Sequence, residues 1–440
     1  MKWLAMLALV AAPVAARADS VGNCHVGAYR LSDGRVVDLA PTAPDQLRWR
    51  MLDGSTGALT AGANDTWTST LGWTTRADGL TVTLGDCATG KITFGGRDGQ
   101  RIVFDVRETR VAVAGSITLA GRLVMPAVGD KVPLVVLIHG SEHESARDGY
   151  ALQRLLPAEG IGVFVYDKRG TGASGGSYTQ DFGVLADDAV AALAAARALA
   201  GPRAGRVGLQ GGSQGGWVAP LAATRAAVDF VVVSFGLAVS PLEEDTQAVE
   251  LEMKLAGHAP AEVARALEVA HAAQAVMASD LTTGFHEFAV IRDRYQHEPW
   301  FKDLHGNFTW ALLPYPEAEL RAKAPAYRFH TPWTYDALPV LRAVRAPSLW
   351  ILGEDDLDAP SAETSRRLQR LIAGGRPITL AMFPRAEHGM TEYERGADGK
   401  RVSTRYAPGY FAMLRDFIRD GRLHGTYGAA RLTVSKAPRR

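Results

Sequence analysis

The sequence predicts an α/β protein: a parallel sheet with helices on both faces, preceded by a small antiparallel β-domain and interrupted by a helical insertion. From about residue 111, apolar runs typical of buried strands alternate with helical patterns. Before that point, short alternating runs are separated by turns such as Asp53-Gly54 and Asp78-Gly79. Between about 239 and 335 the alternation stops, and this stretch is too long for a loop.

The composition is that of a globular protein. The chain has 440 residues, enough for more than one domain, with 47% apolar and 22% charged residues. Its formal net charge of +1 gives no indication of a nucleic-acid partner or of binding to an anionic surface. After the N-terminus, no stretch is long and apolar enough to be a transmembrane helix.

The first 18 residues have the pattern of a signal peptide. Lys2 precedes an apolar run from Trp3 to Val14, and Ala16-Arg17-Ala18 has the small-x-small form of a cleavage site. A membrane anchor is the alternative, but the run is too short to span a bilayer. We therefore predict cleavage after Ala18 and a periplasmic or secreted protein.

Residues 19–110 are predicted to form the antiparallel β-domain. This segment contains both cysteines of the chain, Cys24 and Cys87. In an exported chain an even pair suggests one structural disulfide, with two buried free thiols as the alternative. Trp67 and Trp73 belong either to the core of this domain or to a ligand-binding surface, and the core is the commoner case.

The α/β core is assigned to residues 111–238 and 336–425. It begins with a hairpin from Val111 to Val124. The expected parallel strands are Leu134 to Ile138, Ile161 to Tyr166, Val207 to Gln210, Phe230 to Ser234, Ser348 to Leu352 and Ile378 to Phe383. Helices are expected near 149–158, 184–200, 214–225, 361–373 and 408–420.

The insertion, residues 239–335, is predicted to be a mostly helical cap. It contains a long helical pattern from Pro260 to Ala270 and is rich in aromatic residues towards its end. Ligands of open α/β sheets bind at the carboxyl ends of the strands, so we expect the cap to lie there. Residues 426–440 form a basic tail without a clear pattern.

The strongest motif is Gly211-x-Ser213-x-Gly215, between a strand-like run and an apolar helix. This is the nucleophile-elbow pattern, in which a serine sits on a strained turn too tight for side chains two residues away. A second match, from Gly172 to Gly176, is centred on Ser174. No apolar helix begins there, so we interpret Ser174 as part of a turn.

A serine nucleophile needs a base and an orienting acid, each placed just after a strand. Asp356 follows one expected strand in Gly353-Glu354-Asp355-Asp356, and His388 follows the next. The chain order Ser213, Asp356, His388 is the order Ser-Asp-His found in enzymes whose nucleophile lies on such an elbow. We expect the neighbouring Asp355 and Asp358 to face solvent or to cap the helix that begins near residue 361.

These motifs resemble the α/β-hydrolase superfamily over roughly residues 110–420, and the esterase and prolyl-oligopeptidase-like branch of bacterial hydrolases in particular. His139-Gly140-Ser141 and the segment from Tyr166 to Ser174 also look like that branch. The resemblance implies an oxyanion hole formed by the backbone N–H groups of Ser141 and Gln214. It also implies that Asp167 and Arg169 brace a loop.

One departure from this family pattern is Glu142-His143-Glu144, where relatives usually have a small residue after His-Gly-Ser. These charges are close enough to the site to narrow its substrate range. His139 and His143 have no third ligand at a recognisable spacing, so we predict no metal and no cofactor.

The sequence therefore predicts an exported serine hydrolase that cleaves carboxylic esters of small molecules. A peptidase acting on short peptides is the alternative, because Glu243, Gln247 and Glu250 share a helical face that is either solvated or able to bind a substrate amine. A binding module on an inactive hydrolase fold is a third possibility, against which the complete set of Ser, Asp and His argues. The oligomeric state is not predicted.

Overall fold

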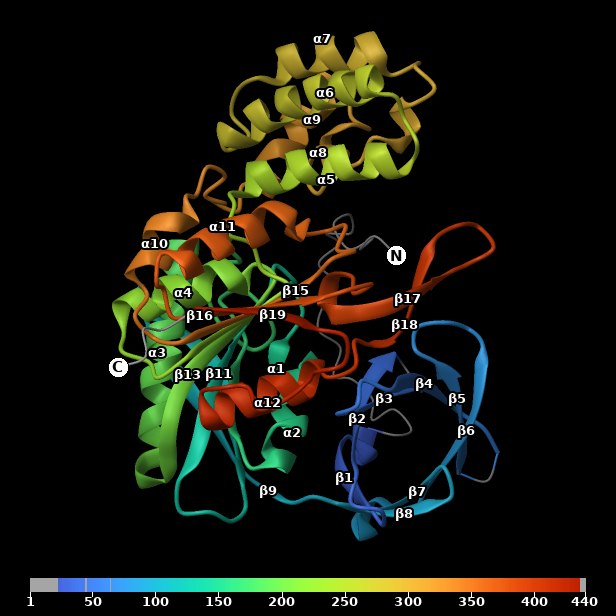
Figure 1. Ribbon diagram of the computed structural model, residues 1–440, viewed down its shortest axis with the longest axis vertical. Helices are drawn as coiled ribbons and strands as arrows, with labels where there is room; N and C mark the ends of the chain where they lie inside the picture. Colours follow the sequence, from blue (N-terminus) through green and yellow to red (C-terminus); the bar gives the residue numbers. More distant parts are fainter. Residues whose placement is uncertain (1–22, 44–45, 64, 436–440) are drawn as a thin grey trace.

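The computed structural model describes residues 23–43, 46–63 and 65–435. They form an N-terminal barrel, an α/β core and a helical cap (Figure 1). The predicted signal peptide, residues 1–18, lies outside the described residues. Within the described part of the chain, no helix has both the length and the apolar character needed to cross a bilayer.

The N-terminal domain is a closed antiparallel barrel of eight strands. The strands are β1 (Gly27–Leu31), β2 (Val36–Ala43), β3 (Gln46–Met51), β4 (Thr56–Ala61), β5 (Thr66–Leu71), β6 (Ala77–Leu84), β7 (Lys91–Phe94) and β8 (Arg97–Arg101). Alternate side chains fill its interior, Trp67 among them at 3% exposure. Trp73 is instead partly exposed and packs on Tyr406 of the core. The antiparallel β-domain is confirmed, and its closure leaves no free sheet edge.

Cys24 and Cys87 are joined in a disulfide with a Cα–Cα distance of 5.8 Å. Cys87 begins a short 3₁₀ helix between β6 and β7, and Cys24 lies just before β1. The bond therefore ties the beginning of the barrel to its last pair of strands.

Replacing both cysteines by serine should lower the free energy of unfolding of the barrel by about 4 kcal/mol, because the bond closes a long loop in the unfolded chain. Denaturant unfolding of the wild-type protein and of the double Cys→Ser variant measures the difference. Reductant should destabilise only the wild-type protein. Alkylation of both thiols in the native protein without reductant would contradict the bond.

The core sheet has nine strands in the order β19-β16-β15-β14-β13-β11-β12-β10-β9. They are β9 (Phe104–Val113), β10 (Ile117–Pro126), β11 (Val132–Ile138), β12 (Gly162–Tyr166), β13 (Ala204–Gly212), β14 (Val231–Ser234), β15 (Ser348–Gly353), β16 (Ile378–Phe383) and β19 (Arg431–Val434). The strands from β12 to β16 are parallel, whereas β9, β10 and β19 run antiparallel to their neighbours.

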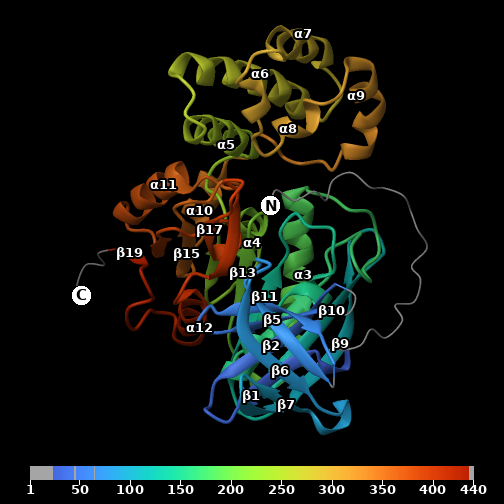
Figure 2. The same ribbon diagram turned by 90° about the vertical axis from the view of Figure 1, so that its right-hand side faces the viewer.

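Helices cover both faces of this sheet (Figures 1 and 2). One face packs on α3 (Phe182–Ala200), α4 (Gly215–Arg225), α10 (Ala337–Ala343) and α11 (Ser361–Ala373). The other face packs on α1 (Ala146–Gly149), α2 (Leu152–Leu155) and α12 (Tyr410–Asp420). Alternate residues of β11 enter the two cores, which explains why the strand is apolar throughout.

Three sequence expectations differ from the structure in detail. The strand β9 begins at Phe104, so the large sheet starts before residue 110; its first half is charged and has no apolar run. The helix expected at 149–158 is replaced by α1, α2 and a 3₁₀ turn, because the backbone is extended at Tyr150 and Pro157 cannot continue the hydrogen bonds of α2. The segment 426–440 contains β19, whose side chains are mostly exposed, so its pairing leaves little hydrophobic signal.

The cap is a separate helical layer above the sheet (Figures 1 and 2). It comprises α5 (Pro241–Leu255), α6 (Pro260–Ala278), α7 (Phe285–Tyr295), α8 (Thr309–Leu312) and α9 (Glu317–Lys323) and has its own hydrophobic core. The fully buried Asp245 of α5 accepts hydrogen bonds from Phe308 N, from Thr309 N and Oγ1, and from Gln274. This carboxylate holds the loop before α8 against α5.

A two-stranded hairpin, β17 (Thr391–Arg395) and β18 (Arg401–Tyr406), projects from the core beside the barrel (Figure 1). The barrel also contacts α2, where Arg154 forms an ion pair with the buried Asp38 of β2. The barrel therefore packs on the core at two places.

Candidate active site

Ser213 lies on the turn between β13 and α4 with a φ of +53°, in the left-handed region that few non-glycine residues adopt. The turn is held from both sides, because Ser213 N donates to Ser234 O at 3.1 Å and Gly216 N donates to Ser213 O at 2.7 Å. Strained backbone of this kind persists only where the surrounding structure holds it. The side chain is presented at the end of β13.

The glycines of the motif are required by close packing. A β-carbon on Gly211 would overlap the carbonyl group of Gly215. A β-carbon on Gly215 would lie 2.8 Å from Ile138 O of the neighbouring strand. The Gly-x-Ser-x-Gly pattern is therefore the sequence that this turn allows.

Asp356 and His388 follow β15 and β16 and meet at the same edge of the sheet. His388 Nδ1 donates to Asp356 Oδ2 at 3.0 Å. The other carboxylate oxygen, Oδ1, accepts the Ala359 N–H at 2.7 Å, and Asp356 is only 1% exposed. Both oxygens of this buried acid are thus engaged, and one of them fixes the imidazole ring.

Phe235 lies between His388 and the turn that carries Ser213. Its ring packs edge-on against the His388 ring, with a centroid distance of 4.9 Å, and also lies where a β-carbon on Gly212 would sit. Among the described residues, no hydrogen bond joins Ser213 Oγ to His388. Contacts between a nucleophile and its base often tighten only when substrate binds.

Burial lowers the pKa of His388, but the charge of Asp356 and its hydrogen bond outweigh this effect and raise that pKa to about 9. The negative charges of Asp358 and Glu244 act in the same direction. Glu244, in the first turn of α5, lies on the cap side of the site. Burial raises the pKa of Glu244 well above its usual value, and the charge of His388 opposes this effect.

This pKa gives a prediction for the pH dependence. Only neutral His388 can accept a proton, so kcat/KM for an uncharged ester should rise as the pH increases through about 9. Well below that value it should rise about tenfold per pH unit. Asp356→Asn should move the midpoint down, because the carboxylate that raises the pKa is gone. A wild-type midpoint near 6.5, the ordinary value, would contradict the raised pKa of His388.

The predicted oxyanion donors lie next to the elbow. Gln214 immediately precedes α4, and a β-carbon on Gly140 would lie 3.5 Å from Ser213 Cβ. Lys168 Nζ donates to Gly140 O at 2.6 Å, and Tyr178 Oη donates to Ser141 O at 2.6 Å. Among the described residues, no protein group accepts the backbone N–H of Ser141 or Gln214. Both N–H groups are therefore available to a ligand.

Glu142 and His143 follow the Gly140 loop and differ in their surroundings. Glu142 turns inward, accepts a hydrogen bond from the Tyr150 hydroxyl and lies 3.6 Å from His139 Nδ1. The exposed His143 stacks on the Tyr178 ring with a centroid distance of 3.7 Å. Glu142 is thus part of the wall behind the Gly140 loop.

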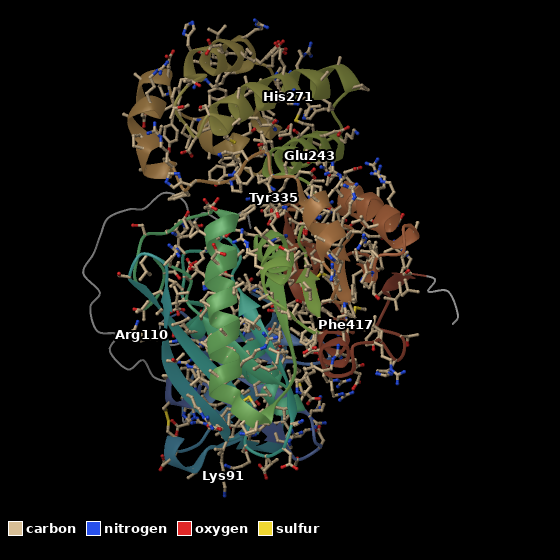
Figure 3. The ribbon with its side chains drawn as sticks, turned by 90° about the vertical axis from the view of Figure 1, so that its left-hand side faces the viewer. Lys91, Arg110, Glu243, His271, Tyr335 and Phe417 are labelled. Carbon is tan, nitrogen blue, oxygen red and sulfur yellow. A yellow bond between two sulfur atoms is a disulfide. The ribbon has the colours of Figure 1, made fainter. Side chains whose placement is uncertain are left out.

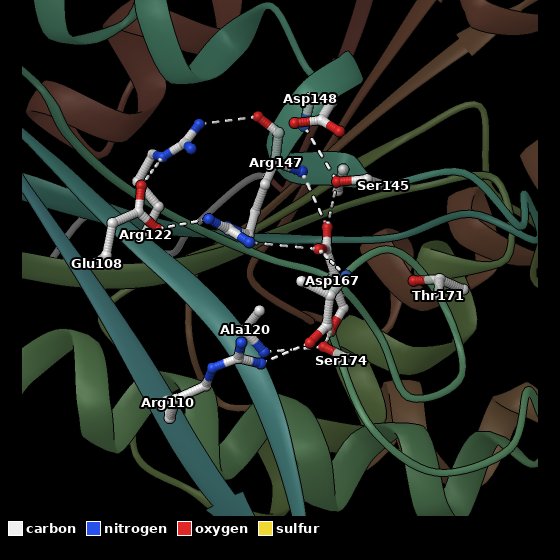
Figure 4. A network of polar contacts seen from close by, with 12 residues as sticks. Glu108, Arg110, Ala120, Arg122, Ser145, Arg147, Asp148, Asp167, Thr171 and Ser174 are labelled. Atoms are coloured by element: carbon white, nitrogen blue, oxygen red, sulfur yellow. Dashed lines mark hydrogen bonds and ion pairs between the residues drawn. The ribbon is translucent and has the colours of Figure 1, made fainter. Parts of the chain in front are cut away.

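The second Gly-x-Ser-x-Gly match forms a structural turn (Figure 4). Ser174 Oγ donates to Asp167 O at 2.5 Å and accepts the Ala120 N–H at 2.8 Å. The Asp167 carboxylate accepts from Ser145 Oγ at 2.7 Å and from Ala173 N at 3.0 Å. Arg169 forms a bidentate pair with Asp188 on α3. Asp167 and Arg169 thus occupy bracing positions.

The neighbouring residues Asp355 and Asp358 have different partners, through a side-chain oxygen in Asp355 and through the backbone carbonyl in Asp358. Asp355 Oδ2 accepts the Tyr393 hydroxyl at 2.9 Å, and Asp358 O accepts from Asn307 of the cap. The N-cap of α11 is Pro360, with no side-chain capping bond. Of the two expectations for Asp355 and Asp358, capping of this helix is therefore wrong, whereas both residues are partly exposed to solvent.

The acidic face of α5 is also engaged within the protein. Glu243 completes a capping box with Ser240 and pairs with Arg367, and Glu250 pairs with Lys254 at 2.5 Å. Gln247 Nε2 donates to Glu243 O. Figure 3 shows Glu243 on the side of the cap that faces Tyr335 of the core. The carboxyl group nearer the site is that of Glu244, next along the helix.

Sequence reasoning missed Asn307, Lys168 and Glu244. Asn307 Nδ2 donates to Glu244 Oε1 at 3.0 Å as well as to Asp358 O, so it joins the cap to the acid loop. No local pattern marks it, because its partners are distant in the sequence. Lys168 is the second residue after β12 and is almost fully buried, which is rare for a lysine; only its position near the end of an apolar strand could have indicated this.

A parallel sheet with a serine elbow after β13, an acid after β15 and a histidine after β16 is the arrangement of the α/β-hydrolase fold, which this chain has. Residues 129–312 match the family model described as Hydrolase_4: Serine aminopeptidase, S33. The match covers less than half of the 440 residues and includes Ser213 but neither Asp356 nor His388.

Several solved structures are similar to the chain. One is the Pyrococcus furiosus esterase Pf2001, at 17% identity over 65% of this chain and 83% of that chain, with a TM-score of 0.42. Another is a Pyrococcus horikoshii acylaminoacyl peptidase, at 15% identity over 88% of this chain and 57% of that chain, with a TM-score of 0.44. A third is Est1E of Butyrivibrio proteoclasticus with ferulic acid bound, at 15% identity over 64% of this chain and 90% of that chain, with a TM-score of 0.37. The comparison with curated proteins finds no match. At these identities the likeness concerns the fold alone, and no residue role is taken from these proteins.

Proposed function

We propose that the protein is a serine hydrolase that cleaves carboxylic esters of small molecules through an acyl-enzyme. The observation that carries the proposal is the hydrogen bond between His388 and the buried Asp356, at the same sheet edge as the strained elbow of Ser213. A buried acid that orients a histidine near such a serine is the arrangement that activates a hydroxyl nucleophile.

In this mechanism Ser213 Oγ attacks the acyl carbonyl carbon while His388 Nε2 takes its proton. The negative charge on the carbonyl oxygen is stabilised by the backbone N–H groups of Ser141 and Gln214. His388 returns the proton to the leaving alcohol, which departs. A water molecule, deprotonated by His388, then attacks the acyl-enzyme, and His388 returns this proton to Ser213 Oγ as the bond to the acyl group breaks and the carboxylic acid is released.

The second candidate is a peptidase acting on short peptides with a free amino terminus. It is favoured by Glu244, whose carboxyl group is close enough for the charge of His388 to act on it. An ammonium group in the site would stabilise the ionised form of this acid. We rank esters first because Glu243 and Glu250, two further acidic residues of α5, already have cationic partners.

Because we rank esters first, we expect nitrophenyl esters of short and medium acyl groups to be better substrates than aminoacyl nitroanilides. The kcat/KM for the esters should be more than about tenfold higher, which corresponds to at least ~1.4 kcal/mol in activation free energy. Both panels are measured on the wild-type protein, on Glu244→Gln and on Glu250→Gln, a control on the same helix. A preference for anilides that Glu244→Gln alone abolishes would establish the peptidase instead.

We also propose export to the periplasm or the medium. The Cys24–Cys87 disulfide supports this, because such bonds persist in oxidising compartments. The role as a binding module on an inactive fold is the least favoured, since Ser213, Asp356 and His388 are all present at the expected strand ends.

A further inference from the structure

The hairpin β17–β18 lies between the loop that carries His388 and the barrel. It begins directly after the turn that contains His388. Ala407 N, just after the hairpin, donates to Met390 O at 2.8 Å, so the hairpin leaves and re-enters the core at one place. The hairpin is therefore joined to the loop of His388 both through the chain and through this hydrogen bond.

Arg401 of β18 contacts the residues that immediately precede both members of the acid–base pair. Its Nη1 donates to Asp355 O at 2.7 Å and to Glu387 Oε1 at 2.9 Å. Asp355 precedes Asp356, and Glu387 precedes His388. A single nitrogen atom thus connects the acid loop to the base loop.

The guanidinium group of Arg401 is itself held in place. It lies over the Tyr393 ring at 4.2 Å from the centroid, and the side chain is only 11% exposed. The Tyr393 hydroxyl donates to Asp355 Oδ2 at 2.9 Å, which adds a second link between the hairpin and the acid loop. Charge-assisted hydrogen bonds at such a shielded position are stronger than exposed ion pairs.

The barrel supports the other side of the hairpin. Trp73 N donates to Ser403 O at 2.8 Å, and Tyr406 N donates to Gly54 O at 2.9 Å. β-Carbons on Gly54 and Gly72 would overlap the carbonyl groups of Tyr406 and Thr404, respectively. The two barrel turns approach the hairpin backbone so closely that only glycine fits there.

We propose that Arg401 is a positioning residue that sets the placement of Asp356 relative to His388, and that the N-terminal barrel serves to hold the hairpin that carries it. The inference rests on the proposed function, in which this pair activates Ser213. It gives the barrel a role in catalysis without any contact with substrate.

The test is the rate of covalent labelling of Ser213 by a fluorophosphonate, which needs no knowledge of the substrate. Arg401→Gln should label about tenfold to a hundredfold more slowly than wild type, the scale on which small misplacements act. Arg395→Gln is the matched control, because Arg395 lies on the same hairpin, is exposed, and donates from Nη1 to the backbone Gly399 O within the hairpin turn. It should label at the wild-type rate.

The pH profile of labelling separates positioning from a simple charge effect. Asp356, Asp358 and Glu244 are the acids whose charges act on His388. Removing the positive charge of Arg401 alone would raise the midpoint of the profile. A loosened contact between Asp356 and His388 lowers the midpoint, which is the result we expect. A raised or unchanged midpoint in Arg401→Gln would overturn the inference.

Glu387→Gln provides a second variant if Arg401→Gln does not fold. It weakens one of the two Arg401 contacts, keeps the bond to Asp355 O, and should slow labelling in the same direction. Without labelling of the wild-type protein the proposed function fails, and the inference with it. Normal labelling of wild type together with equal rates for Arg401→Gln and Arg395→Gln would overturn the inference alone.

The role of the barrel is tested with a pair of glycines. Gly72→Ala places a β-carbon against Thr404, whereas Gly34→Ala has a similar backbone strain at a φ of +86° but meets nothing within 4 Å. Labelling should slow in Gly72→Ala and not in Gly34→Ala. Equal rates in the two variants would show that the barrel does not support the site.

Discussion

Asp356→Asn is expected to lower turnover by about 10⁴-fold while the fold is kept, as does the equivalent change in other enzymes with a catalytic triad of serine, histidine and aspartate. The asparagine amide would present an N–H group where the carboxylate accepts the His388 Nδ1 proton at 3.0 Å. The imidazole would then favour the other tautomer, with its proton on the nitrogen that must act as base. Turnover of a nitrophenyl ester and melting temperature measure the two effects separately.

The neighbouring acids provide the controls. Asp355→Asn and Asp358→Asn should each change turnover by less than about tenfold, or ~1.4 kcal/mol. Asp355 accepts a bond from Tyr393, and Asp358 meets the cap through its backbone carbonyl. If Asp356→Asn stays active while one of these two variants is inactive with unchanged melting, the acid is assigned wrongly.

Ser213→Ala is expected to have the largest effect, a loss of about 10⁶-fold in turnover, since without the hydroxyl no acyl-enzyme forms. The matched control is Ser174→Ala in the second Gly-x-Ser-x-Gly segment. Ser174 Oγ bonds to Asp167 O and Ala120 N, so its loss should cost about 1–3 kcal/mol of stability and leave the chemical step unchanged. Inactivation by Ser174→Ala at unchanged stability would contradict this division of roles.

Much of the fold could be predicted because its signals are local. The strands around β13 are apolar on both sides, and a helical pattern follows each of them before the next strand begins or the cap ends. The elbow could be found because steric limits on a tight turn allow almost only glycine at two fixed distances from Ser213. Asp356 and His388 could be proposed because each directly follows such a strand.

The contacts around the site could not be predicted in this way. Arg401 meets Asp355 across 46 residues, and Gly54 meets Tyr406 from a different domain. Asn307 reaches Asp358 from the cap. No periodicity joins such pairs, since their proximity follows from how the barrel, cap and hairpin pack. The charged first half of β9 and the exposed β19 were missed for a related reason, because edge strands bury few side chains.

The measurement that tests the central claim most directly is mass-spectrometric mapping of the fluorophosphonate adduct on the intact protein. Only a serine activated by a base reacts at an appreciable rate. We expect a single adduct on Ser213, lost in Ser213→Ala and strongly slowed in Asp356→Asn. An adduct on Ser174, or no adduct on the folded wild-type protein, would contradict the assignment of Ser213 as the nucleophile.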